Sequence, residues 1–268
     1  MRKFLAPFIA LLLAVCPISA PAYGGVDFDL VDDDISIGSG SSIDDVVPVT
    51  ICARLLVEGN GESNLGYIYG KVSSGSTAGP RFFTDDSSGT NRLSFGLSST
   101  GTSAAPNRTS NDNAYTDNQF FVACARKSDT SVNANTISIF VNGTEVSYSS
   151  TNDGSTALAS DAALTAVIGN RVGTDRTFNG IIDDFVKIGA SLTDAQISDL
   201  SNAMLRYYAI NKYQSSVKAY IPLDDQPDGA SGDGDTFFDR SGNGNNGTGS
   251  DGSNNTGLTA KASTLSYP

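Results

Sequence analysis

The sequence predicts an all-β protein, built as an antiparallel sandwich or barrel. Runs rich in Val, Ile, Phe and Tyr alternate with clusters of Gly, Ser, Asn and Asp, as expected for strands joined by turns. The segment Val141-Asn142-Gly143-Thr144 places Asn-Gly between two such runs, which is the strongest short-range signal for a hairpin. The close spacing of these short runs favours an antiparallel architecture.

Each strand is predicted where apolar and β-branched residues form a run of suitable length. In chain order the predicted strands are 26–31, 34–38, 47–57, 65–72, 80–84, 91–98, 119–127, 136–142, 145–149, 164–170 and 178–189. The long polar stretches at 99–118 and 150–163 are predicted to be loops over one end of the molecule. Another strand is expected at 217–223, and a tail rich in Asp, Gly and Asn follows it.

One helix is predicted, from 194 to about 211. Thr193 and Gln196 have the spacing of a capping box, in which each side chain binds the other residue's backbone N–H. An apolar stripe follows at helical spacing, formed by Ile197, Leu200, Met204 and Tyr208. This stripe should lie on the body of the protein.

Composition and charge exclude several classes of function. Acidic residues outnumber basic ones 29 to 17, for a net charge of −12, and the chain has no His and no Trp. Only Glu58, Glu62 and Glu145 are Glu, so 26 of the acids are Asp. Without His, Ser-His-Asp and Cys-His catalysis and imidazole-held zinc are excluded. The negative charge argues against nucleic acid as a partner, and abundant Asp suits hard cations.

The first 22 residues have the pattern of a secretory signal peptide. A basic start is followed by an apolar run from Phe4 to Val15 and by small residues that end at Ala22, the predicted cleavage position. The mature chain is therefore expected to be secreted, periplasmic or on the cell surface, and not membrane-spanning. Removal of the signal leaves Cys52 and Cys124, an even count that suggests a disulfide in an exported protein. Two unpaired buried thiols are the alternative.

Three segments resemble laminin-G-like, concanavalin A-like jelly-roll domains. The stretch Phe178-Asn-Gly-Ile-Ile-Asp-Asp184 is similar to the closing strand of that family, and the predicted helix follows it as it does there. Residues 25–37 are similar to the family's early strand pair. Residues 219–225 and 239–248 are similar to the family's opening strand and to the loop after it. The resemblance implies a two-sheet antiparallel jelly-roll sandwich with one α-helix after the closing strand.

The order of these segments is unusual, because the family's opening motif stands at the C-terminus of this chain. Fifty-two residues, 217–268, are too few for a second sandwich. We therefore expect a circularly permuted single domain over 23–268, in which 217–268 adds a strand and a loop that complete the sandwich. Donation of this segment to a second copy, a form of self-association, is the alternative. The runs around Cys52 and Cys124 also resemble the two disulfide-bearing strands of pentraxins.

The resemblance implies a structural calcium ion. In strict alternation, Asp184 shares one face of its strand with Ile182, Val186 and Ile188, so it should be buried and need a cation or several donors. By resemblance to jelly-roll relatives, the expected ligands are Asp184, Asp224, Asp239 and Asn245, with loop carbonyls. The alternative is that Asp184 accepts backbone N–H bonds and that the other acids are solvated.

The family hosts sugar-binding modules, adhesion modules and glycoside hydrolases, and we expect a non-catalytic binding module for carbohydrate or another surface partner. Hydrolysis needs paired carboxylates, whereas Glu58 and Glu62 lie in a Gly-rich turn and Glu145 stands alone. Sugar binding normally uses aromatic platforms, for which Tyr67, Tyr69, Phe82, Phe83, Phe95 and Tyr115 are available. The predicted ligand-binding residues are Tyr67, Tyr69, Asn107, Arg108, Asp112 and Tyr115. The rival class is a structural or adhesive protein of an envelope, extracellular matrix or virion.

Overall fold

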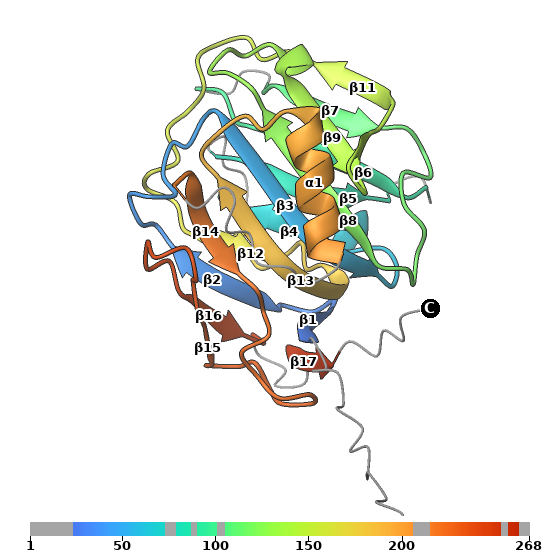
Figure 1. Ribbon diagram of the computed structural model, residues 1–268, viewed down its shortest axis with the longest axis vertical. Coiled ribbons are helices and arrows are strands. Elements are labelled where there is room, and N and C mark those ends of the chain that lie inside the picture. Colours follow the sequence, from blue (N-terminus) through green and yellow to red (C-terminus); the bar gives the residue numbers. More distant parts are fainter. Residues whose placement is uncertain are drawn as a thin grey trace, which may run out of the picture.

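A computed structural model describes residues 24–72, 79–86, 90–100, 105–205, 215–252 and 257–262. Its strands form two antiparallel sheets that pack face to face, with one α-helix on the outside (Figure 1). The predicted signal peptide, 1–22, lies outside the described residues. No helix of the described part is long and apolar enough to cross a bilayer.

The first sheet, called sheet A, has the strand order β10-β9-β8-β3-β13-β1-β17, with β14 also paired to β13. Its strands are β1 (Gly24–Asp29), β3 (Val49–Val57), β8 (Phe121–Lys127), β9 (Ile137–Val141), β10 (Thr144–Glu145), β13 (Asn179–Ile188), β14 (Val217–Ile221) and β17 (Thr259–Ala262). The Asn142-Gly143 turn joins β9 to β10, which confirms the predicted hairpin.

The second sheet, called sheet B, has the order β11-β7-β6-β5-β4-β12-β2-β16-β15. Its strands are β2 (Asp34–Gly38), β4 (Leu65–Gly70), β5 (Arg81–Asp85), β6 (Arg92–Gly96), β7 (Asn107–Ser110), β11 (Tyr148–Asn152), β12 (Ala166–Ile168), β15 (Thr236–Phe237) and β16 (Gly247–Ser250). Short 3₁₀ turns at Glu62–Asn64 (η1) and Ala134–Thr136 (η2) precede β4 and β9.

The main core lies between the two sheets, because alternate residues of each strand point into it. Phe28 and Leu55 of sheet A pack there with Ile68, Phe82 and Phe95 of sheet B, all fully buried. The loop predicted at 99–118 is only partly correct, since it contains strand β7.

A second, smaller core lies between sheet A and helix α1 (Asp194–Leu205). Ile197, Leu200 and Met204 fill it as predicted, whereas Tyr208 lies outside the described residues. The capping box is confirmed, because Thr193 N–H donates to Gln196 Oε1 at 2.8 Å and Gln196 N–H donates to Thr193 Oγ1 at 3.3 Å.

The predicted disulfide between Cys52 and Cys124 is also confirmed. It joins directly opposite residues of β3 and β8 beneath the helix.

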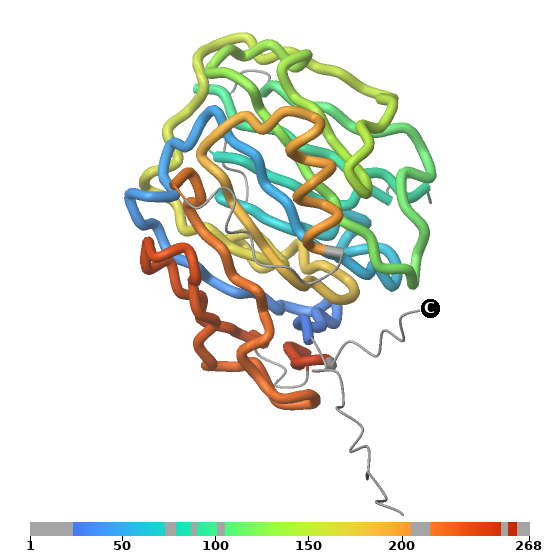
Figure 2. Tube along the Cα trace, viewed as in Figure 1, coloured from blue at the N-terminus to red at the C-terminus, as the bar shows by residue number. Residues whose placement is uncertain are grey.

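The C-terminal segment contributes to both sheets. Strand β14 pairs with β13 and β17 with β1 in sheet A, while β16 pairs with β2 in sheet B. Figure 2 shows the result, with the red end of the chain lying along the blue beginning. On one edge of β13, β1 pairs with its first half and β14 with its second half, while β3 pairs with the other edge.

Candidate functional site

Asp184 lies at an irregularity in β13, at the point where the neighbouring strand changes from β1 to β14. Its φ of 51° breaks the alternation. Ile182 therefore faces the main core while Val186 and Ile188 face the helix, so the predicted shared face is wrong. Asp184 is nevertheless buried, and burial raises its pKa to about 6. Its Oδ1 accepts a hydrogen bond from the Tyr220 hydroxyl at 2.9 Å.

Two of the other predicted calcium ligands lie together in the C-terminal segment. Asp239 accepts hydrogen bonds from the backbone N–H groups of Tyr220, Ser241 and Asn245, and Asn245 Nδ2 adds another at 3.2 Å. Asp224 instead pairs with Arg240 at 2.7 Å. Within the described ranges, no group of three or more Asp, Glu, Cys or His side chains has the geometry to hold a metal. Calcium stays a prediction.

Two of the predicted aromatic ligand contacts are corrected by their burial. Tyr69 is 0% exposed and its ring stacks on Phe185 in the main core, at 5.3 Å between centroids. Tyr115 is 5% exposed and stacks on Phe121 at 4.9 Å. Phe82 and Phe95 are likewise fully buried. These rings fill the space between the sheets and cannot form an exposed platform.

Tyr67 lies on the opposite face of sheet B from Tyr69. A register shift in β4 between these two residues inserts Ile68, so Tyr67 pairs with Phe83 while Tyr69 pairs with Phe82. The rings of Tyr67 and Phe83 stack with their centroids 5.1 Å apart and their planes 12° apart. Tyr67 is buried, with the guanidinium of Arg171 on its ring, and Phe83 remains partly exposed.

Polar residues continue this outer face across the next strands. Phe83 pairs with Ser94 of β6, and Ser94 pairs with Thr109 of β7. The Ser94 and Thr109 hydroxyl oxygens lie 3.0 Å apart. One row further along, Arg81 pairs with Gly96, and Gly96 pairs with Asn107. We call the partly exposed side chains of Arg81, Phe83 and Asn107, together with the buried side chains of Tyr67, Ser94 and Thr109 on the same face, the outer platform.

The remaining predicted ligand-binding residues lie elsewhere. Arg108 pairs with the core residue Phe95 and points toward sheet A, where it donates to the Ile137 carbonyl at 2.7 Å and lies over the Tyr148 ring. Asp112 is exposed in the turn after β7. The structure therefore brings only Tyr67 and Asn107 of the predicted set onto one surface.

Arg81, Ser94 and Thr109 were not among the residues predicted from the sequence. The alternation Arg81-Phe82-Phe83-Thr84 was a usable signal, since Phe82 is an obvious core residue and its neighbours must then face outward.

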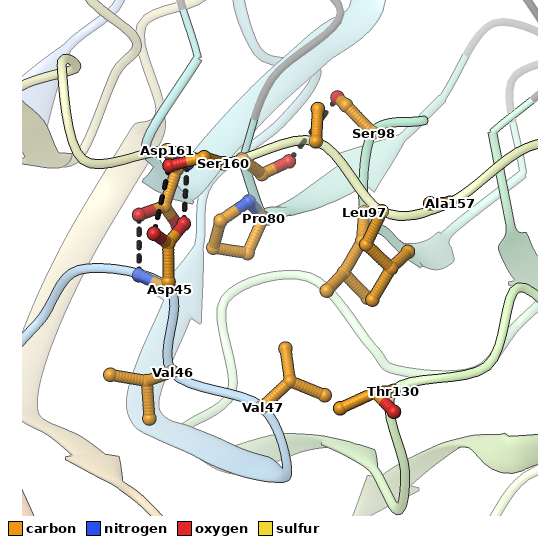
Figure 3. A pocket seen from close by; sticks show the side chains of 13 residues that line it. Asp45, Val46, Val47, Pro80, Leu97, Ser98, Thr130, Ala157, Ser160 and Asp161 are labelled. Atoms are coloured by element: carbon orange, nitrogen blue, oxygen red, sulfur yellow. Dashed lines mark hydrogen bonds between the residues drawn. The ribbon is translucent and has the colours of Figure 1, made fainter. Parts of the chain in front are cut away.

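A separate cavity of about 390 Å³ opens at the end of the sandwich where β3 and β5 begin (Figure 3). Val46, Val47, Pro80 and Leu97 form its apolar wall. On the other side Asp45 and Asp161 bind each other, each backbone N–H donating to the other's carboxylate at 2.8 and 2.7 Å. These oxygens are already engaged and none of the described residues that line the cavity is aromatic, so it suits an aliphatic group better than a sugar.

A smaller cavity of about 190 Å³ lies beside Tyr115, Gln119, Phe120 and Asn142. The guanidinium of Arg54 lies over the Phe120 ring, 3.9 Å from its centroid. Aromatic side chains and polar groups therefore line this cavity together.

A comparison with known protein families shows to which family the chain belongs. The model described as the concanavalin A-like lectin/glucanases superfamily matches residues 30–198, well over half of the sequence. The chain belongs to this superfamily. The match begins within the early strand pair and ends within helix α1, so it includes the closing strand β13. The predicted resemblance of this strand to the family is therefore confirmed. A comparison with curated protein sequences found no match.

A solved structure with a TM-score above 0.5 supports this fold. A Bacteroides ovatus protein, provisionally described as carbohydrate-binding, has a TM-score of 0.61 and 17% identity, over 91% of this chain and 60% of that one. This chain thus corresponds to less than two thirds of that protein. The CBM40 of a Ruminococcus gnavus sialidase has a TM-score of 0.46 and 11% identity, over 67% and 98%. A pentraxin from Limulus polyphemus has a TM-score of 0.43 and 14% identity, over 68% and 84%.

Proposed function

We propose that the chain is an exported, non-catalytic carbohydrate-binding module and that the outer platform of sheet B holds the saccharide. The stacked pair of Tyr67 and Phe83 is the observation that carries the proposal. Sugar rings present C–H groups on their flat sides, and an aromatic ring is an effective surface for them because it is apolar and rigid. Phe83 is partly exposed and is supported from beneath by Tyr67, so it is held in place before a ligand arrives.

The polar part of the platform suits sugar hydroxyls. Asn107 is partly exposed and offers an amide that is fixed by Ala105 and Asn152, while the buried Ser94 and Thr109 hydroxyls lie 3.0 Å apart on the same face. A sugar hydroxyl both donates and accepts, so side chains that can also do both are suitable partners. The description of the Bacteroides ovatus protein agrees with this class of ligand.

The acidic residues near the platform support a non-catalytic role. A glycosidase places two carboxyl groups about 5–9.5 Å apart on either side of the bond. On strands β5 to β7, Asp85 is the acidic residue of the outer face, and it is paired with Arg92 at 3.2 Å. Glu145 accepts from the Tyr148 hydroxyl and Glu62 from the Thr177 hydroxyl, both away from the platform.

Export and calcium belong to this proposal as well. The buried disulfide agrees with an oxidising compartment, and calcium at Asp184, Asp224, Asp239 and Asn245 would be structural. These four residues lie on β13 and in the C-terminal segment, so the ion would brace that segment and would not touch the saccharide.

Binding to a panel of polysaccharides, with and without a chelator, tests the function. We expect at least one saccharide to bind, and Phe83→Ala to weaken it about 30-fold, because losing one aromatic contact costs on the order of 2 kcal/mol. Phe238→Ala is the matched control, because Phe238 is 53% exposed and lies beside β15, away from the outer platform. The affinity of this variant for the saccharide should be unchanged. If no saccharide binds under any calcium condition, the proposal fails and a structural or adhesive role is favoured.

A further inference from the structure

Arg81 differs from the other arginines of the described chain. Each of the others forms an ion pair with an acidic side chain, namely Arg54, Arg92, Arg108, Arg126, Arg171, Arg176 and Arg240. The Arg81 side chain forms no hydrogen bond or ion pair with the described residues, and its Nε is buried without an acceptor. In a chain with 29 acidic residues, an unpaired guanidinium is unexpected. A buried donor without a partner needs an explanation.

The cross-strand neighbours of Arg81 have no side chains that could pair with its guanidinium. Its partners across the sheet are Gly70 on one side and Gly96 on the other. Arg81 Nε lies 3.5 Å from the point where a Cβ on Gly96 would stand, and Asn107 Cβ lies 2.9 Å from that point. The Arg81 side chain therefore lies across a glycine from Asn107. No acidic side chain stands in this row, so the positive charge is available to a ligand.

The position of Arg81 relative to Phe83 is suited to one sugar ring. Residues two apart on a strand point the same way and are roughly 7 Å apart. A pyranose stacked on Phe83 thus carries its ring substituents to the guanidinium. The planar fork of an arginine matches the two oxygens of a carboxylate, which accept two parallel hydrogen bonds.

We propose that the ligand of the outer platform is an acidic saccharide and that Arg81 binds its carboxylate. This inference rests on the proposed function, since it names the class of sugar held at the same site. The carboxylate would give Arg81 the partner that it lacks in the described chain, and Asn107 would stand beside it. A neutral sugar would leave the guanidinium unpaired beneath the ligand, so the site should discriminate against it.

Short uronate oligosaccharides and their methyl esters test the inference, because esterification removes the charge and keeps the sugar. Trimers of galacturonate, glucuronate and mannuronate are titrated calorimetrically in 0.15 M salt, each beside its ester. We expect one acid to bind about tenfold or more tightly than its ester. Arg81→Gln should abolish this preference, while Arg81→Lys should keep part of it. Lys218→Gln, which removes the same charge from β14, should leave the preference intact.

Each other result overturns the inference. Equal binding of an acid and its ester, or binding of neutral saccharides alone, contradicts it and leaves the proposed function standing. An acid preference that survives Arg81→Gln in a variant with wild-type thermal stability removes Arg81 as its cause. If neither uronates nor neutral saccharides bind, the proposed function fails, and the inference fails with it.

Discussion

Removal of the disulfide should strongly destabilise the fold without disturbing the sheets. Cys52 and Cys124 are 72 residues apart and lie opposite each other on β3 and β8. In the chain-entropy model, a cross-link that closes a loop of this length lowers the free energy of folding by about 4 kcal/mol. The flanking ladder from Val49 to Leu55 does not need the cross-link, so the double variant Cys52→Ala/Cys124→Ala should still fold.

The loss is measured by denaturant and thermal unfolding. For a chain of this size 1 kcal/mol shifts the midpoint by about 2–4 °C, so a drop of about 8–16 °C is expected. Val122→Ala is the packing control, because Val122 is buried in the same small core but closes no loop. A reductant should lower the midpoint of the wild type and leave the double variant unchanged. The reasoning is refuted if the double variant loses no more stability than Val122→Ala, or if reductant lowers both proteins equally.

Two further predictions concern cations and protons. If calcium binds at Asp184, a calcium concentration of 100 times Kd should stabilise the fold by about 2.7 kcal/mol and raise the thermal midpoint by roughly 5–10 °C. Asp184→Asn should abolish this gain. A thermal midpoint that changes with neither calcium nor chelator would contradict the site. Burial raises the pKa of Asp33 to about 7, above its value of about 3.9 in the unfolded chain, so the folded state binds the proton more tightly. In chelator-treated protein, protonation of Asp33 should therefore increase stability as the pH falls from 8 toward 5. Asp33→Asn should reduce the slope of stability against pH, whereas Asp112→Asn, at an exposed position, should not. An unchanged slope in Asp33→Asn would contradict the assignment of this slope to Asp33.

Strand positions could be predicted where the side chains alternate between core and surface. The run 91–98 contains β6, and the run 34–38 is β2 without change. Strand β7 could not be predicted in this way, because Asn107-Arg108-Thr109-Ser110 has no apolar alternation. Its strand conformation comes from pairing with β6 and β11 on either side. The same holds for β16, whose sequence Gly-Thr-Gly-Ser is extended because β2 and β15 flank it.

The candidate site was harder to predict because small irregularities of the strands decide which way side chains point. One inserted residue in β4 puts Tyr67 outside and Tyr69 inside, although strict alternation gives both the same face. One residue with positive φ in β13 moves Ile182 and Ile188 to opposite sides of sheet A. Neither irregularity can be predicted from the pattern of apolar residues in the sequence. The absence of a partner for Arg81 likewise depends on cross-strand neighbours that only the register reveals.

The location of the binding surface is the central claim, and mapping backbone amide shifts by NMR during titration with a bound saccharide tests it most directly. The account predicts that the largest shifts fall on Arg81, Phe83, Ser94 and Thr109, in strands β5, β6 and β7 of the outer platform. Shifts concentrated at Val47 and Leu97, which line the large cavity, or at Tyr115 and Gln119, which line the small one, would contradict it.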